Sequence, residues 1–192
     1  MVVGSMRHVV SHTEFFGDPC LPGRWWVSLP KDGNAAREWV DRLASAAQLK
    51  CPGRVAVLDA DAVMVSNLRV WENLVLPLWY REGGALEGFE GRLSNLLVAT
   101  GLSEDRQTIL MGLQPAALDR GERRLMVLLR SLLLEPSCVI VEEEFWRDML
   151  GRGEETAHGR AWRALLAAEC MIVAGGCEVP GGWGLVAERE EE

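Results

Sequence analysis

The sequence predicts one α/β domain over 1–192, built on a parallel-rich sheet with an inserted helical subdomain. The chain has 192 residues, 48% of them hydrophobic, and chains of this length usually form a single domain around one core. Short apolar runs bounded by Gly and Pro alternate with stretches whose apolar residues recur at helical spacing. This alternation is typical of a parallel sheet covered by helices.

The first predicted unit is a strand, a helix and a second strand. Residues 24–29 are aromatic and β-branched and run into a Pro-Lys-Asp-Gly loop, so we expect a strand there. A second short strand is expected at 54–58, after a Cys-Pro-Gly turn. Five apolar residues between them have helical spacing: Ala36, Trp39, Val40, Leu43 and Ala47. This order predicts parallel strands joined by a crossover helix.

Residues 66–134 are expected to form the helical subdomain. Its first helix begins near Val70 and should end or kink at Pro77. Gly83 and Gly84 separate it from a second amphipathic helix, which should stop near Gly101. A third helix should follow Asp119, because a polar cap there precedes a long apolar pattern.

The last third of the chain returns to strands. A buried strand begins at Cys138 and ends in three carboxylates, Glu142, Glu143 and Glu144. A helix at 161–168 and a buried strand at 170–174 follow. Residues 183–187 are predicted as an edge strand, and 188–192 as a solvated tail.

Composition excludes several classes of protein. The formal charge of -8 disfavours nucleic-acid binding, which needs a basic surface. The five cysteines have no CxxC spacing, so we expect reduced thiols, with Cys138 and Cys170 buried, rather than disulfides or zinc. His8, His12 and His158 lack metal-ligand spacing and are interpreted as surface residues. No signal peptide or membrane-spanning run is apparent, so a cytoplasmic protein is expected.

Two blocks of the sequence resemble the ATPase subunits of ABC transporters. In 118–145 a capping signal, an apolar helix, a Glu-Pro break and a carboxylate-ending strand follow one another as in that family. The block 66–78 is similar to the family's T-V-x-E-N-V-x-x-P-L pattern, most familiar in bacterial phospholipid-transport and toluene-tolerance systems. The resemblance extends over 24–176 in layout and implies the P-loop NTPase-like fold of ABC ATPases.

The resemblance places the family's GxxGxGKST phosphate loop at 30–38. The cofactor-binding positions carried over are Gly33, Asn34, Ala35, Ala36, Arg37 and Glu38. Ala36 stands where the family has its lysine, and Ala35 adds a Cβ where a glycine would let phosphate approach. Because the ammonium group of that lysine is missing, we expect poor or no nucleotide binding and therefore no cofactor.

The family's LSGGQ signature corresponds here to 118–122. The nucleotide contacts carried over to it are Asp119, Arg120 and Gly121. Asp119 places a negative charge where the γ-phosphate of a partner's nucleotide would lie, and it should form a capping box with Glu122. Arg120 could still bind phosphate or an acidic partner.

The carboxylates at 142–144 have two interpretations. By resemblance Glu143 matches the general base and Glu142 the metal-holding Asp, although Glu142 is longer by one methylene group. Alternatively the three glutamates are a solvated strand end. Gly175 stands where the family has a switch histidine, and Asp59 or Ala60 where it has the loop glutamine.

The resemblance implies a catalytically degenerate ABC-type subunit, a pseudo-ATPase with a structural or regulatory role in a membrane transport complex of the lipid-transport kind. Its expected partners are a membrane permease subunit and another ABC ATPase, as a homo- or heterodimer, at the inner face of the cell membrane. The permease contact is assigned to Leu68, Trp71, Trp79 and Tyr80. Alternatively, Trp71 packs in the core or the subdomain, as is also expected for Trp25, Trp26 and Trp39.

Two alternatives remain. The chain could hydrolyse ATP with Mg²⁺ through an altered loop, with Lys31 or Arg37 in place of the missing lysine and Glu143 as the base. It could also be a soluble interaction module that reuses the ABC fold without a transporter.

Overall fold

The centre of the protein is a six-stranded sheet with the order β1-β6-β2-β5-β4-β3. The computed structural model describes residues 9–30, 32–81, 88–176 and 179–187, and every strand pairing among them is parallel. The strands are β1 (Val9–Ser11), β2 (Gly23–Ser28), β3 (Val55–Leu58), β4 (Cys138–Glu142), β5 (Cys170–Gly175) and β6 (Gly184–Ala187). The parallel-rich α/β sheet predicted from the sequence is confirmed.

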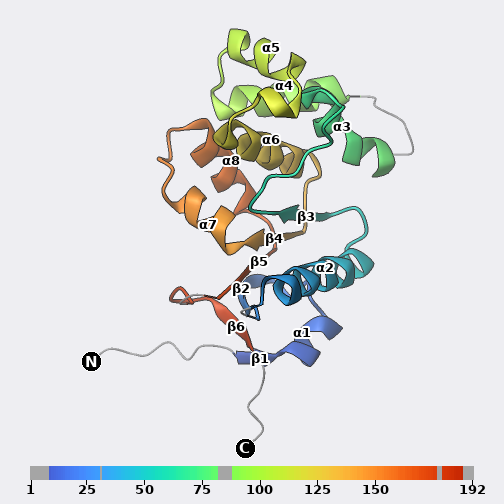
Figure 1. The fold of residues 1–192 in the computed structure, drawn as a ribbon, viewed down its shortest axis with the longest axis vertical. Helices are drawn as coiled ribbons and strands as arrows, with labels where there is room; N and C mark the ends of the chain where they lie inside the picture. The colour runs from blue at the N-terminus through green and yellow to red at the C-terminus, as the bar shows by residue number, and fades with distance from the viewer. Residues whose placement is uncertain (1–8, 31, 82–87, 177–178, 188–192) are drawn as a thin grey trace, which may run out of the picture.

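Helices cover both faces of this sheet (Figure 1). Helices α1 (His12–Gly17) and α2 (Gly33–Lys50) lie on one face, and α6 (Arg120–Leu133) and α8 (Ala157–Leu165) lie on the other. Alternate strand residues therefore enter different cores: Trp25 and Val27 pack with α2, whereas Trp26 packs on the opposite side. Because both faces are buried, the central strands are continuous apolar runs.

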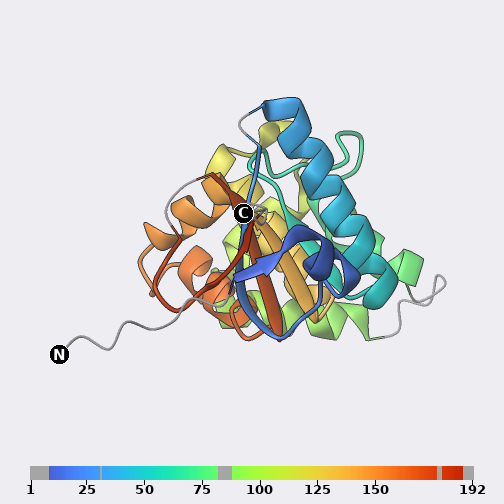
Figure 2. The same ribbon diagram turned by 90° about the horizontal axis from the view of Figure 1, so that it is seen from below.

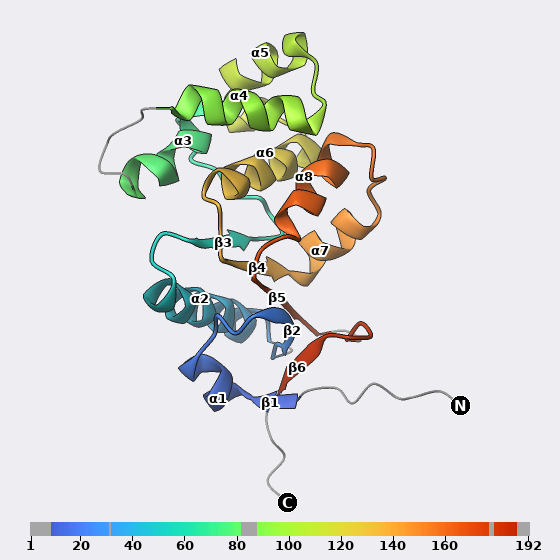
Figure 3. The same cartoon turned by 180° about the vertical axis from the view of Figure 1, so that it is seen from behind.

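The remaining helices follow β3 and β4. Helices α3 (Val70–Arg81), α4 (Phe89–Thr100) and α5 (Glu104–Gly112) and the short 3-10 helix at Pro115–Ala117 lie between β3 and α6 in the chain. They gather at the end of the molecule away from α1 and α2 (Figures 1 and 3). Helix α7 (Glu143–Leu150) begins directly where β4 ends, on the other side of the strands from α2 (Figure 2). The division into one domain with a subdomain at 66–134 stays a prediction.

Helix α3 does not end at Pro77, so of the two predicted outcomes the end of the helix is excluded, and a kink stays a prediction. Pro77 lacks the N–H that would bond to the Asn73 carbonyl, yet the helix continues to Arg81. Leu78 is fully buried, and Arg81 Nη1 donates a hydrogen bond to the Leu134 carbonyl at 2.6 Å. Tertiary contacts therefore hold the last turn. The predicted Gly83-Gly84 break lies outside the described residues.

Two further expectations concern the end of α4 and the position of β6 in the sheet. Helix α4 ends at Gly101, which has the left-handed φ of 73° that favours glycine, as predicted. The prediction of 183–187 as an edge strand is wrong, because β1 pairs with the outer side of β6, with Val10 opposite Val186.

The burial of two cysteines was predicted correctly from the sequence. Cys20, Cys51, Cys138 and Cys170 are free, and the last two are buried; Cys177 lies outside the described residues. Within the described part of the chain, no helix combines the length and the apolar character needed to cross a bilayer.

The turn before α3 is held by the side chain of Asn73, which is only 1% exposed. Asn73 Oδ1 accepts a hydrogen bond from Val65 N at 2.7 Å. Its Nδ2 donates to the carbonyls of Val65, Leu68 and Arg69 at 3.1, 3.2 and 3.1 Å. The Glu72 carboxylate accepts from Arg69 N at 2.6 Å. The Glu-Asn pair of the 66–78 block therefore has a structural role.

Replacing Asn73 tests this role. Asn73→Ala should lower the free energy of unfolding by about 2 kcal/mol, because it removes all the hydrogen bonds that this buried side chain makes to the turn. Urea denaturation measures the change. The exposed Asn67 offers a matched control, and Asn67→Ala should stay within about 0.5 kcal/mol of wild type. Equal losses in the two variants would contradict the assignment.

Candidate functional site

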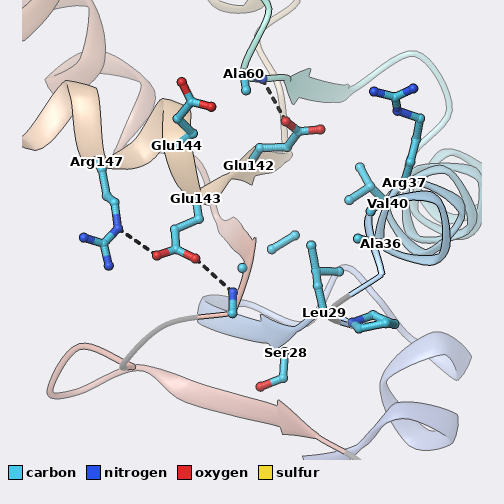
Figure 4. Close-up of a pocket in the computed structure, with 15 residues that line it drawn as sticks. Ser28, Leu29, Ala36, Arg37, Val40, Ala60, Glu142, Glu143, Glu144 and Arg147 are labelled. Carbon is cyan, nitrogen blue, oxygen red and sulfur yellow. Dashed lines mark hydrogen bonds and ion pairs between the residues drawn. The ribbon is translucent and has the colours of Figure 1, made fainter.

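The carboxyl ends of β2, β4 and β5 meet beside the N-terminus of α2 and border an open cavity of about 620 Å³ (Figure 4). Ser28, Leu29 and Pro30 form its β2 side, and Ala174, Gly175 and Gly176 its β5 side. The three glutamates 142–144 face them from β4 and α7. Ligands of open parallel sheets bind at this edge, so the cavity is the candidate functional site.

The residues aligned with the phosphate loop are helical. All six carried-over positions, Gly33, Asn34, Ala35, Ala36, Arg37 and Glu38, lie in the first turns of α2. Gly33, Ala36 and Arg37 line the cavity, and the other three do not. A Cβ built on Gly33 would meet nothing within 4 Å, so the one retained glycine is not required by close packing. Lys31 lies outside the described residues.

The N-terminus of α2 is capped by Asp32, a residue that the sequence analysis did not single out. Asp32 Oδ1 accepts hydrogen bonds from Asn34 N at 3.1 Å and Ala35 N at 2.9 Å. These backbone amides are the donors that a helix N-terminus offers to an anion. The carboxylate therefore occupies a position that a phosphate oxygen would need. The signal was present in the sequence, as an Asp directly before a helical pattern.

The three glutamates at 142–144 are a solvated strand end only in part, because Glu144 is exposed whereas Glu142 and Glu143 are half-buried. Glu142 is the last residue of β4, and its Oε2 accepts a hydrogen bond from Ala60 N at 2.8 Å. Glu143 and Glu144 begin α7. Glu143 Oε2 accepts from Gly176 N at 2.9 Å, and its Oε1 lies 2.7 Å from Arg147 Nε (Figure 4). Across the described residues, no three His, Cys, Asp or Glu side chains are grouped so as to hold a metal ion.

Glu143 rests directly on the backbone at Gly175. A Cβ built on Gly175 would lie 2.4 Å from Glu143 Oε2 and 2.6 Å from Glu143 Cβ. No side chain fits at this position while Glu143 keeps its place. The glycine is therefore needed for the close approach of the general-base candidate to β5.

Residues 118–122, which correspond to the family's signature, make hydrogen bonds and an ion pair within the chain. The predicted capping box is present: Asp119 Oδ1 accepts from Glu122 N at 2.7 Å, and Glu122 Oε2 accepts from Asp119 N at 3.0 Å. Arg120 forms an ion pair with Glu144. Asp119, Arg120 and Gly121 do not line the cavity, and only Arg120 reaches a residue that does.

The buried Arg124 was also missed by the sequence analysis. It is 3% exposed, and its Nη2 donates to the Ala60 carbonyl at 2.9 Å and to Glu144 Oε1 at 3.2 Å. Its Nη1 lies 3.0 Å from Asp148 Oδ2. Burial alone would raise the pKa of Asp148, but the hydrogen bonds from Arg124 and Arg152 outweigh it and lower that pKa. Arg124 therefore joins α6 to α7 and to the segment after β3.

The residues assigned to a partner interface lie on α3 and the turn before it, away from the cavity. Trp71, Trp79 and Tyr80 are 42%, 48% and 77% exposed, and Leu68 is half-buried. Of the tryptophans interpreted as core or subdomain packing, Trp25 and Trp26 are buried as expected, Trp39 is half-buried, and Trp71 is too exposed for the core. The interface role itself stays a prediction.

His158 is not a surface residue, which corrects the prediction. It is half-buried, and its Nε2 lies 2.8 Å from the carbonyl of Gly121, so it fixes the start of α6. Burial lowers the pKa of His158, partly opposed by the Gly121 carbonyl and reinforced by Arg152.

Comparisons with known proteins identify the fold. No protein-family model and no curated protein match the sequence. Among solved structures, the dimeric ATP-binding cassette MJ0796 bound to ADP and phosphate has a TM-score of 0.56 and 14% identity, over 81% of this chain and 75% of that one. An ATP-binding subunit of an ABC transporter has a TM-score of 0.54 and 18% identity, over 80% and 69%.

A third similar structure is cbiO1 from Clostridium perfringens, part of the ABC transporter complex cbiONQ. Its TM-score is 0.50 at 13% identity, over 81% of this chain and 68% of that one. The chain therefore has the fold of the ABC ATP-binding cassettes, as the resemblance implied.

The Asp32 cap gives the first prediction from the site. Asp32→Ala should lower the free energy of unfolding by about 0.5–2 kcal/mol, because two amides of α2 lose their acceptor. Asp32→Asn keeps an acceptor oxygen and should retain most of the stability. Urea denaturation of the three proteins measures this order. An alanine variant as stable as wild type would show that the carboxylate does not hold the helix.

The lowered pKa of His158 gives the second prediction from the site. The folded protein holds this proton less tightly than the unfolded chain, so stability should be lost as pH falls below about 6.5. Between about pH 7.5 and 5.5, the free energy of unfolding of wild type should fall more than that of His158→Gln, in urea titrations at each pH. His8 and His12 are present in both proteins, so the difference between the two pH slopes reports on His158. Equal pH slopes would contradict the assignment.

Proposed function

We propose that this chain is a cassette subunit of an ABC-type transport complex that does not hydrolyse ATP and has a structural or regulatory role. The observation that carries the proposal is the Asp32 carboxylate, which accepts hydrogen bonds from two amides at the N-terminus of α2. In the resembling family this helix end receives phosphate. An anion would have to displace a carboxylate from the same donors.

The charges around the cavity support the proposal. Three glutamates line it, and a triphosphate would approach them without a described lysine to neutralise its charge. Ala36 stands at the lysine position. Arg147 already pairs with Glu143, and the carboxylate of Glu142 accepts from Ala60 N. Arg37 also lines the cavity, so three carboxylates lie beside two guanidinium groups, of which that of Arg147 is already paired. We infer that this balance of charge makes the cavity a poor site for a magnesium triphosphate.

The proposed partners are a membrane permease subunit and a second cassette, at the inner face of a membrane. The cassette MJ0796 is dimeric in its solved structure, and cbiO1 belongs to a transporter complex. The exposed aromatic side chains of Trp71, Trp79 and Tyr80 support a contact along α3. The similarity of 66–78 to lipid-transport ATPases favours a lipid as the transported substrate.

Nucleotide titration tests the central claim. About 5 mM Mg-ATP should leave the melting temperature of the protein unchanged, because a ligand stabilises the folded state only if it binds there. Differential scanning fluorimetry measures the shift. An active cassette in the same buffer is the positive control and should show a dose-dependent rise.

The double variant Asp32→Gly/Ala36→Lys probes the physical reason. It frees the α2 amides and restores an ammonium group, so its melting temperature should rise with Mg-ATP more than that of either single variant. A dose-dependent rise in the wild-type protein would overturn the proposal and favour the active ATPase.

A further inference from the structure

Four of the cysteines gather on the side of the sheet that α1 and α2 cover. Cys138 and Cys170 are direct neighbours across β4 and β5, and both are buried in the core beneath α2. Cys20 lies in the linker between α1 and β2 and packs against that core. Cys51 is the residue that ends α2.

Cys20 and Cys51 converge on the same backbone carbonyl. Cys20 Sγ donates a weak hydrogen bond to the Ala47 carbonyl at 3.7 Å, and Cys51 N donates to it at 2.8 Å. Both residues are half-buried, whereas Cys138 and Cys170 are 0% and 1% exposed. A small solute can therefore reach the first pair but not the second.

We propose that Cys20 and Cys51 are an oxidation site, at which a hydroperoxide converts the two thiols into an intramolecular disulfide. The two residues lie in different chain segments that meet at the end of α2, so the bond would tie the linker before β2 to that helix.

The order of the two steps follows from the environment of Cys20. Burial, and then the neighbouring Cys51 thiol, raise the pKa of Cys20 to about 12, so Cys20 stays protonated at neutral pH. Because the thiolate is the nucleophile, Cys51 reacts first. Its sulfur attacks the terminal peroxide oxygen, the O–O bond breaks, and a sulfenic acid forms while the rest of the peroxide leaves as hydroxide (from hydrogen peroxide) or alkoxide (from an organic hydroperoxide).

Cys20 completes the reaction. Its thiol first passes its proton to the hydroxyl group of the Cys51 sulfenic acid, its sulfur then attacks the Cys51 sulfur, and the S–O bond breaks to release water. The two thiols together lose two electrons, which the peroxide gains. The product closes the loop from 20 to 51 and restricts the unfolded chain.

The full chain, treated with hydrogen peroxide and then blocked with N-ethylmaleimide, provides the test. Trypsin should place Cys20 in peptide 8–24 and Cys51 in peptide 51–54, and mass spectrometry should find these two joined. The melting temperature should rise by about 5 °C or more and return on treatment with dithiothreitol.

Three single variants separate this pair from the other thiols. Cys20→Ser and Cys51→Ser should each abolish both the linked peptide and the rise in melting temperature, whereas Cys177→Ser should change neither. Peptides 8–24 and 51–54 that both carry maleimide after oxidation would overturn the proposal. A link to peptide 131–147, which contains Cys138, would overturn it as well. Neither result depends on whether nucleotide binds, so the proposed function is tested separately.

Discussion

The buried guanidinium of Arg124 is the interaction on which the edge of the sheet depends. A buried charge is tolerated only when it is paired, and Arg124 finds its partners at Ala60, Glu144 and Asp148. Ala60 in turn offers its N–H to Glu142, and Glu143 accepts from Gly176. The contacts of Arg124 and Ala60 thus join α6 to α7 and to the ends of β3 and β4, and the contact of Glu143 with Gly176 joins α7 to the end of β5.

The same principle operates at two helix N-termini. Asp32 caps α2, and Asp119 caps α6, in each case with a carboxylate that accepts from backbone amides. These are the two helix ends at which the resembling family handles phosphate. Here both helix ends are capped by carboxylates of the chain itself, and Arg120 and Arg147 pair with glutamates. The chain therefore combines the fold of a cassette with helix N-termini whose caps come from its own side chains.

Local patterns in the sequence predicted local structure well. The central strands are continuous apolar runs, and the spacing of Asp119 and Glu122 predicted a capping box that is present. Asp32 was missed because its stretch was compared with a loop motif instead of with the ordinary helix-cap pattern. Arg124, the pairing of β1 with β6 and the burial of His158 depend on residues far apart in the chain. Periodicity carries no information about such tertiary partners.

The contact between Glu143 and Gly175 couples the start of α7 to the end of β5. A histidine at 175, or any other side chain, would have to occupy space that the Glu143 side chain fills, so it fits only if Glu143 moves. That movement would break the contacts of the Glu143 carboxylate with Arg147 and with the Gly176 N–H. A variant that carries a side chain at 175 therefore needs a second, compensating substitution at 143.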